Sequence, residues 1–173
     1  MKWRGACSTG VVQIGSRRLR VCWTNAGVAF VDDDGPGIKR RIEKRMRMQL
    51  LERPVPGTIR RALARAAKLP GGDDVPIDLS WARDFERDVL LAARSIPWGE
   101  TRPYSWLARE ARRPMAVRAA ATIIAREPLW MLVPWHRVIY KGGKVGGSGA
   151  FGKRKRELLE REQRRRKSAR RRP

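Results

Sequence analysis

The chain has 173 residues, with 40 Lys or Arg against 17 Asp or Glu, which gives a formal net charge of +23. This length suits one ordinary domain or two small ones, and 42% hydrophobic residues argue against disorder throughout. No apolar run approaches the roughly 20 residues of a membrane helix, and no secretory signal is visible at the start. We therefore expect a monomeric cytoplasmic protein, nucleoid-associated if prokaryotic, that does not enter a membrane.

The positive charge indicates an anionic partner. A compact chain at +23 is attracted to polyanions, and most of its cations are Arg, whose planar fork suits phosphate and stacks on bases. Residues 39–68 and 153–173 are strongly basic, whereas residues 73–88 are acidic. Nucleic acid is the favoured partner, with an anionic membrane surface and a general bias toward Arg as the alternatives.

The first half of the chain predicts a small sheet with helices. Short, partly alternating apolar runs separated by turn residues predict strands over residues 10–15, 18–23 and 28–31. Apolar residues at helical spacing predict helices over residues 38–51 and 58–68. We interpret residues 1–78 as an N-terminal α/β domain, so that the whole chain is of the α+β class.

The second half predicts a mostly helical domain over residues 79–162. The expected helices cover residues 80–92, 104–111, 115–126 and 153–161. The two middle helices, separated by a break at Pro114, are typical of a helix-turn-helix, although any two short helices can give this pattern. Residues 163–173 carry many cations and no large apolar side chain, so we expect a disordered basic tail.

Residues 85–162 resemble the DNA-binding and active-site domain of the O6-alkylguanine-DNA alkyltransferases. The resemblance rests on the order and spacing of these pieces: Ile96-Pro97-Trp98-Gly99-Glu100-Thr101, Tyr104, Pro114, Arg118-Ala119, Val133-Pro134-Trp135-His136-Arg137-Val138-Ile139, Lys155, Leu158-Leu159 and Glu162. It implies binding in the DNA minor groove and rotation of the damaged nucleotide out of the helix. The implied partner is double-stranded DNA carrying O6-alkylguanine.

One difference from the family is decisive for the chemistry. Where the family has its alkyl-accepting Cys, this chain has Trp135. Alkyl transfer needs a soft nucleophile such as a thiolate, and an indole N–H has no available lone pair. The pattern is that of the alkyltransferase-like proteins, which recognise the lesion without removing the alkyl group and are thought to pass it to nucleotide excision repair. We expect no catalytic residue, no cofactor and no metal, with Cys7 and Cys22 as core residues of the N-terminal domain.

The resemblance also assigns the remaining candidate residues. Tyr104 is expected at a phosphate and Arg118 in the space left by the rotated base, while Ala119 and Ala120 let the helix approach the groove. His136 and Glu162 become a structural pair once there is no thiol to activate, and Arg137 supports internal structure. The expected lesion pocket consists of Trp135, Val138, Ser148, Gly149 and Phe151, and the tail residues expected on phosphate are Arg164, Arg165 and Arg166.

Some alternatives stay open at this stage. Trp135 either stacks on the lesion or only fills the pocket. Glu127, Trp130, Ser148 and Phe151 depart from the family pattern, which puts the range of accepted alkyl groups in doubt. Besides lesion recognition, the chain could be an active methylated-DNA–protein-cysteine methyltransferase with an unusual acceptor, or a general basic DNA-binding protein.

Overall fold

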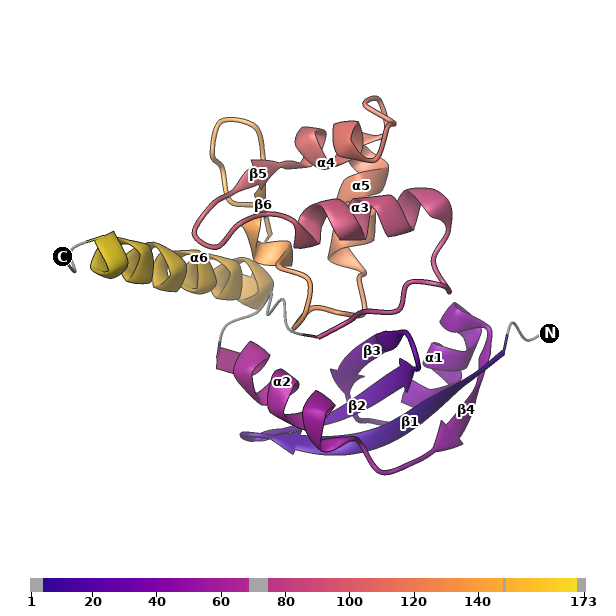
Figure 1. The fold of residues 1–173 in the computed structure, drawn as a ribbon. Helices are drawn as coiled ribbons and strands as arrows, with labels where there is room; N and C mark the ends of the chain where they lie inside the picture. Colours follow the sequence, from indigo (N-terminus) through magenta and orange to yellow (C-terminus); the bar gives the residue numbers. More distant parts are fainter. Residues whose placement is uncertain (1–4, 69–74, 148, 171–173) are drawn as a thin grey trace. The chain divides into compact units, whose positions relative to one another are not determined.

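The computed structural model describes residues 5–68, 75–147 and 149–170. The chain forms two compact units, which are drawn in Figure 1. Unit 1 comprises residues 1–87 and 127–133, and unit 2 comprises residues 88–126 and 134–173. The division therefore lies later than the expected boundary after residue 78, and a short segment of the second half belongs to unit 1.

Unit 1 is built on a four-stranded sheet. Its strands are β1 (Gly5–Ile14), β2 (Arg17–Thr24), β3 (Gly27–Asp33) and β4 (Met48–Glu52), in the spatial order β3-β2-β1-β4. The first three strands form an antiparallel meander, and Gly15 adopts φ 60° in the tight turn between β1 and β2. The sequence analysis predicted these three strands, but the observed strands are longer than the predicted ones.

The fourth strand corrects the sequence prediction. A single helix was expected over residues 38–51, but α1 (Ile38–Met46) ends where Arg47 enters the left-handed region at φ 54°. The chain then pairs as β4 parallel to β1, with Cys7 opposite Leu50. Leu50 and Leu51 continue the helical spacing of apolar residues, so periodicity alone could not separate the helix from the strand.

Helix α2 (Gly57–Lys68) completes the described part of unit 1 and packs against β1 (Figure 1). Its buried residues are Ala62, Leu63 and Ala66, while the opposite face carries the cations. The core below includes Leu19, Val21, Cys22 and Phe30 of the sheet. Burial of one such side chain stabilises the fold by roughly 1.5–3 kcal/mol.

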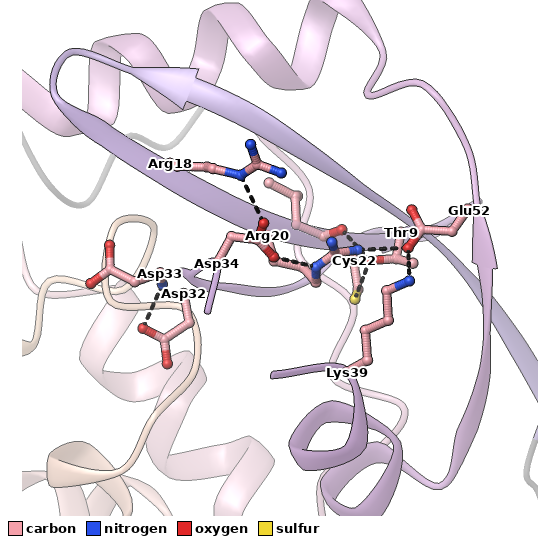
Figure 2. Close-up of polar contacts among 10 residues, drawn as sticks. Thr9, Arg18, Arg20, Cys22, Asp32, Asp33, Asp34, Lys39 and Glu52 are labelled. Atoms are coloured by element: carbon pink, nitrogen blue, oxygen red, sulfur yellow. Dashed lines mark hydrogen bonds and ion pairs between the residues drawn. The ribbon is translucent and has the colours of Figure 1, made fainter. Parts of the chain in front are cut away.

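A buried arginine ties the sheet to its loops. Figure 2 shows Arg20 between two carboxylates, with its Nε 2.7 Å from an oxygen of Asp34 and its Nη1 2.8 Å from an oxygen of Glu52. Lys39 also pairs with Glu52, and Arg18 donates to Asp34. Because each buried charge has a partner, this cluster avoids the cost of an uncompensated ion.

Unit 2 is mostly helical, as predicted. Helix α3 (Asp84–Arg94) begins at the boundary between the units, three or four residues later than expected. The elements that follow are β5 (Arg102–Pro103), α4 (Tyr104–Glu110), α5 (Val117–Ala125), the 3-10 helix η1 (Trp135–Arg137), β6 (Val138–Ile139) and α6 (Gly149–Arg170). The two-residue strands β5 and β6 pair in parallel, which places η1 near the start of α4. The α+β class is thus confirmed.

The C-terminal segment corrects a second prediction. Residues 163–173 were expected to be a disordered tail, but α6 continues as one helix to Arg170 (Figure 1). Arg166 on this extension donates from Nη1 to the carbonyl of Gly99 at 2.9 Å. Arg and Lys have good helix propensity, so a helix that is already nucleated upstream can continue through a basic run. Residues 171–173 lie outside the described part.

None of the helices in the described ranges is long and apolar enough to span a membrane.

Candidate functional site

The core of the candidate site is a buried ion network at η1. Glu162 of α6 accepts hydrogen bonds from His136 Nε2 at 2.6 Å and from Arg137 Nη2 at 3.0 Å. It also accepts one from the backbone N–H of Gly99 at 2.8 Å, while Arg137 Nη1 donates to the carbonyl of Ile96. One carboxylate therefore fixes η1, the turn before β5 and helix α6 to one another.

The electrostatics of this network favour a neutral histidine beside an ionised glutamate. Burial lowers the pKa of His136 below its ordinary value, despite the nearby carboxylate. Burial alone would raise the pKa of Glu162, but the hydrogen bonds from His136 and Arg137 outweigh it and hold this pKa low. His136 then carries its proton on Nε2, which leaves Nδ1 as a buried acceptor with no hydrogen-bond partner in the part of the chain that the structure describes. The expected structural pair of His136 and Glu162 is present.

Trp135 lies at the start of η1 and is enclosed by other side chains. Only 4% of its surface is exposed. The ring of Phe151 stacks on it with 4.4 Å between centroids and 24° between planes, and His136 meets it edge-on at 6.0 Å. Its indole N–H is buried and has no hydrogen-bond partner among the described residues. Trp135 is thus enclosed at the start of η1, with Phe151 over one face.

A buried lysine joins this aromatic pair to Tyr104. Lys155 follows Phe151 by four residues on α6, so both side chains lie on the same face of the helix. Its Nζ lies 5.8 Å from the ring centroid of Trp135 and donates to the hydroxyl of Tyr104 at 3.3 Å. Burial lowers the pKa of Lys155 to about 8 and raises that of Tyr104.

Helices α4 and α5 pack on each other as the expected helix-turn-helix. The turn is closed by Arg112 in the left-handed region at φ 56°, and the N–H of Arg113 returns to the carbonyl of Ala108 at 2.8 Å. Arg118 and Ala119 lie exposed on the first turn of α5. Ala120 is fully buried, so its side chain does not belong to the exposed surface that Arg118 and Ala119 form.

The other predicted site residues differ in how far they are exposed to solvent. Val138 is buried in β6, and Gly149 begins α6 at φ 58°. Ser148 lies outside the described residues. Arg164 and Arg165 are exposed on α6, whereas Arg166 is half-buried through its contact with Gly99.

Two of the residues that depart from the family pattern lie in unit 1. Glu127 is buried and accepts from the backbone N–H of Leu129 at 2.6 Å, and burial raises its pKa to about 8. Trp130 lies under the guanidinium of Arg17, 4.4 Å from ring centroid to Cζ. The described contacts of both residues thus lie within unit 1.

The two cysteines lie in the core of the unit 1 sheet, as expected. Both are buried, and the Cys22 thiol donates to Thr9 Oγ1 at 3.3 Å (Figure 2). Their mutual hydrogen bond, together with burial, raises the pKa of Cys22, and the same bond lowers that of Cys7. A buried thiol has no route to a DNA base without local unfolding of the sheet.

Sequence reasoning missed the placement of Lys155 and the role of the Gly99 backbone. Lys155 was recognised only as part of the family spacing, because a lysine on a basic helix is ordinarily solvated. The usable signal was its spacing of four from Phe151 and of seven from Glu162, which places all three on one helix face. Nothing in the sequence marked the Gly99 N–H as a donor to Glu162.

Comparisons with known proteins agree with this geometry. Residues 84–164 match the family model described as 6-O-methylguanine DNA methyltransferase, DNA binding domain. A methylated-DNA–protein-cysteine methyltransferase of Mycobacterium tuberculosis is 42% identical over 87 residues, which cover 50% of this chain and 52% of that protein. The bifunctional transcriptional activator and DNA repair enzyme Ada of Escherichia coli is 39% identical over 88 residues, which cover 51% of this chain and 25% of Ada.

The likeness of structure extends further along the chain. The crystal structure of Mycobacterium tuberculosis OGT in complex with DNA matches with a TM-score of 0.64 and 28% identity, covering 91% of this chain and 94% of that one. By sequence, the chain spans about half the length of the Mycobacterium relatives that it matches. Over residues 84–164 the chain is therefore similar to the DNA-binding domain of the O6-methylguanine-DNA methyltransferases, and its fold is similar to that of a solved methyltransferase over most of its length.

Proposed function

We propose that this protein binds double-stranded DNA containing O6-alkylguanine and recognises the lesion without accepting the alkyl group. The observation that carries the proposal is Trp135, which stands directly before His136-Arg137-Val138 where the family has its acceptor Cys. In-line displacement at an alkyl carbon needs a nucleophile with an available electron pair, and an indole N–H offers none. The chain thus belongs with the alkyltransferase-like proteins of the family.

The chemistry around the expected acceptor position supports this assignment. His136 directs its Nε2 proton to Glu162, which leaves Nδ1 as the ring nitrogen that could act as a base, but the adjoining side chain is Trp135 and offers no thiol to activate. The only cysteines, Cys7 and Cys22, are buried in a sheet and hydrogen-bonded there. In this proposal the network of His136, Glu162 and Arg137 stabilises the fold and has no part in catalysis.

The DNA-binding part of the proposal rests on the helix-turn-helix. Arg118 is the exposed cation at the start of α5, and the small exposed Ala119 beside it allows close approach to a groove. The minor groove presents a degenerate pattern that mainly separates A·T from G·C pairs, which suits a protein that must find lesions in any sequence. In the proposal Arg118 enters the space of the rotated base and Tyr104 contacts a phosphate. The bound lesion is then left for other repair proteins, with nucleotide excision repair as the candidate pathway.

Two measurements on the wild-type protein test the proposal. Competition binding with matched duplexes carrying guanine or O6-methylguanine, at one salt concentration, should give a clear preference for the damaged duplex. Intact-mass measurement after prolonged incubation with the damaged duplex should show no added methyl group. Stoichiometric methylation of Cys7 or Cys22 would identify an active transferase with an unusual acceptor. Equal affinity for both duplexes would instead indicate a general basic DNA-binding protein.

A further inference from the structure

The side chain that replaces the acceptor cysteine is not itself available to a base. Trp135 is 4% exposed, and three neighbours surround its ring. Phe151 covers one face in a stacked arrangement, His136 meets the ring edge-on, and Lys155 Nζ lies 5.8 Å from its centroid. A purine ring would have to displace one of these groups before it could stack on Trp135.

Phe151 is the member of this group that solvent can reach. It lies in the first turn of α6 and is 45% exposed, although one of its ring faces is occupied by Trp135. Phe151 is one of five large hydrophobic side chains that are exposed in the described ranges; the others are Leu51, Leu91, Met115 and Tyr140. Its neighbour Trp135 lies close to Lys155, which donates to Tyr104 at the start of α4, and an exposed aromatic ring offers a surface on which a base can stack.

The backbone around Phe151 holds the ring in place. A Cβ at Gly147 would lie 2.7 Å from Phe151 Cδ1, so the loop before α6 runs directly against the ring, and Gly147 adopts φ 102°. A Cβ at Gly152 would overlap the carbonyl of Gly147, so the loop and the first turn of the helix are also in close contact. A swing of Phe151 away from Trp135 would have to move this loop.

We propose that Phe151 is the stacking platform for the rotated, O6-alkylated guanine, with Trp135 as the ring that supports it from behind. The base stacks on the exposed face of Phe151, which forms a three-ring column of base, Phe151 and Trp135. This inference rests on the proposed function and deepens it, because it assigns base contact to a residue other than the one at the acceptor position. A flat apolar ring does not depend on the size of the alkyl group, so the platform accepts more than one O6-alkyl lesion.

The competing arrangement is a movable cover, in which the base pushes Phe151 aside and stacks on Trp135. The close contacts of Gly147 and Gly152 oppose this arrangement, as does the enclosure of Trp135 on its other sides. The two arrangements differ in what the removal of Phe151 does. If Phe151 is a platform, removal of its ring lowers the affinity of the protein for the lesion. If Phe151 is a cover, removal of its ring leaves this affinity unchanged or raises it.

The experiment compares Phe151 variants in competition binding with O6-methylguanine and undamaged duplexes. Base–aromatic stacking of about 1–3 kcal/mol corresponds to roughly a 5- to 150-fold change in affinity. Phe151→Ala should therefore reduce affinity for the damaged duplex by a factor in this range and leave the undamaged duplex nearly unchanged. Phe151→Tyr should keep the preference, whereas Phe151→Leu, apolar but not aromatic, should lose most of it. The matched control is Leu91→Ala, since Leu91 is 47% exposed on α3 and has no assigned role.

Each outcome decides between the possibilities. Full lesion preference in both Phe151→Ala and Phe151→Leu, with its loss in Trp135→Ala, would overturn the platform in favour of the cover. An equal lesion preference of Phe151→Leu and the wild type would mean that apolar packing suffices without stacking, and this would also overturn the platform. Thermal unfolding of each variant separates these results from loss of fold. The proposed function is judged separately, from the lesion preference of the wild-type protein.

Discussion

The carboxylate of Glu162 should be the most costly single charge to remove from unit 2. Glu162→Gln keeps the shape of the side chain but removes its charge, and it replaces one acceptor oxygen with a donor NH2. The three groups that donate to Glu162 are His136, Arg137 and the Gly99 backbone, so at least one of them loses its acceptor. Arg137, which is buried and also donates to the Ile96 carbonyl, then faces a neutral amide in place of a carboxylate.

The expected magnitude follows from the burial of both partners. Breaking a buried ion pair from one side costs about 3–5 kcal/mol, because the remaining charge is uncompensated. With a urea m-value of about 2 kcal/mol/M, the unfolding midpoint should fall by about 1.5–2.5 M. The control is Glu160→Gln on the same helix, where the side chain is 62% exposed and pairs with Arg164 at 3.8 Å. An exposed pair of this kind contributes about 0–1 kcal/mol.

The pH dependence provides a second check on the same variant. The pKa of Glu162 is lowered in the folded protein, so its contribution to stability is present above the ordinary glutamate pKa and is lost as the pH falls through the folded value. The difference between wild type and Glu162→Gln should therefore be largest near neutral pH and shrink in acid. If urea unfolding at pH 7 showed a loss no greater than that of Glu160→Gln, the network would not be the structural link described above.

Two further predictions concern groups outside this network. Glu127 holds a pKa of about 8 through burial, so its own contribution to stability should fall as the pH rises from about 4.5 to 8, by up to about 1.4 kcal/mol per pH unit. In chemical denaturation, Glu127→Gln should remove this dependence of the unfolding free energy on pH. The control Asp84→Asn, at an exposed carboxylate, should keep the dependence. An equal pH dependence in the wild type and both variants would contradict the raised pKa of a buried Glu127. Deletion of residues 167–173 removes four cations without touching Arg166, so the plot of log affinity for DNA against log salt should flatten by about 4 units at most. The ratio of damaged to undamaged binding should survive, and an unchanged salt slope would show that this segment does not contact phosphate.

The sequence was sufficient where a local rule and the tertiary fold agree. The strand meander was predictable because short apolar runs alternate with turn residues such as Gly15. The helix-turn-helix was predictable because Pro114 separates two short amphipathic stretches. The buried pair of His136 and Glu162 followed from the resemblance of the motif and its spacing.

The sequence was insufficient where the outcome depends on long-range pairing. Strand β4 looks helical because its apolar residues continue the spacing of α1, and only pairing with β1 makes it a strand. The basic C-terminal segment looked disordered because it has no apolar face, yet it extends a helix anchored upstream by Leu158 and Leu159. The stack of Phe151 on Trp135 depends on α6 starting at Gly149, four residues before the expected start, and no local pattern announces that start.

The return of residues 127–133 to unit 1 has a consequence for dissecting the protein. The polypeptide crosses between the two units three times, so no single cut in the gene separates them. A fragment that starts at residue 88 would contain the whole of unit 2 but would also carry Leu129, Met131, Leu132 and Val133, which are all buried in the intact chain. Without the rest of unit 1, these four side chains would be exposed to solvent as an apolar patch. Such a fragment should aggregate unless these residues are replaced by polar ones. Each unit is compact, but neither is encoded by one continuous segment of the sequence.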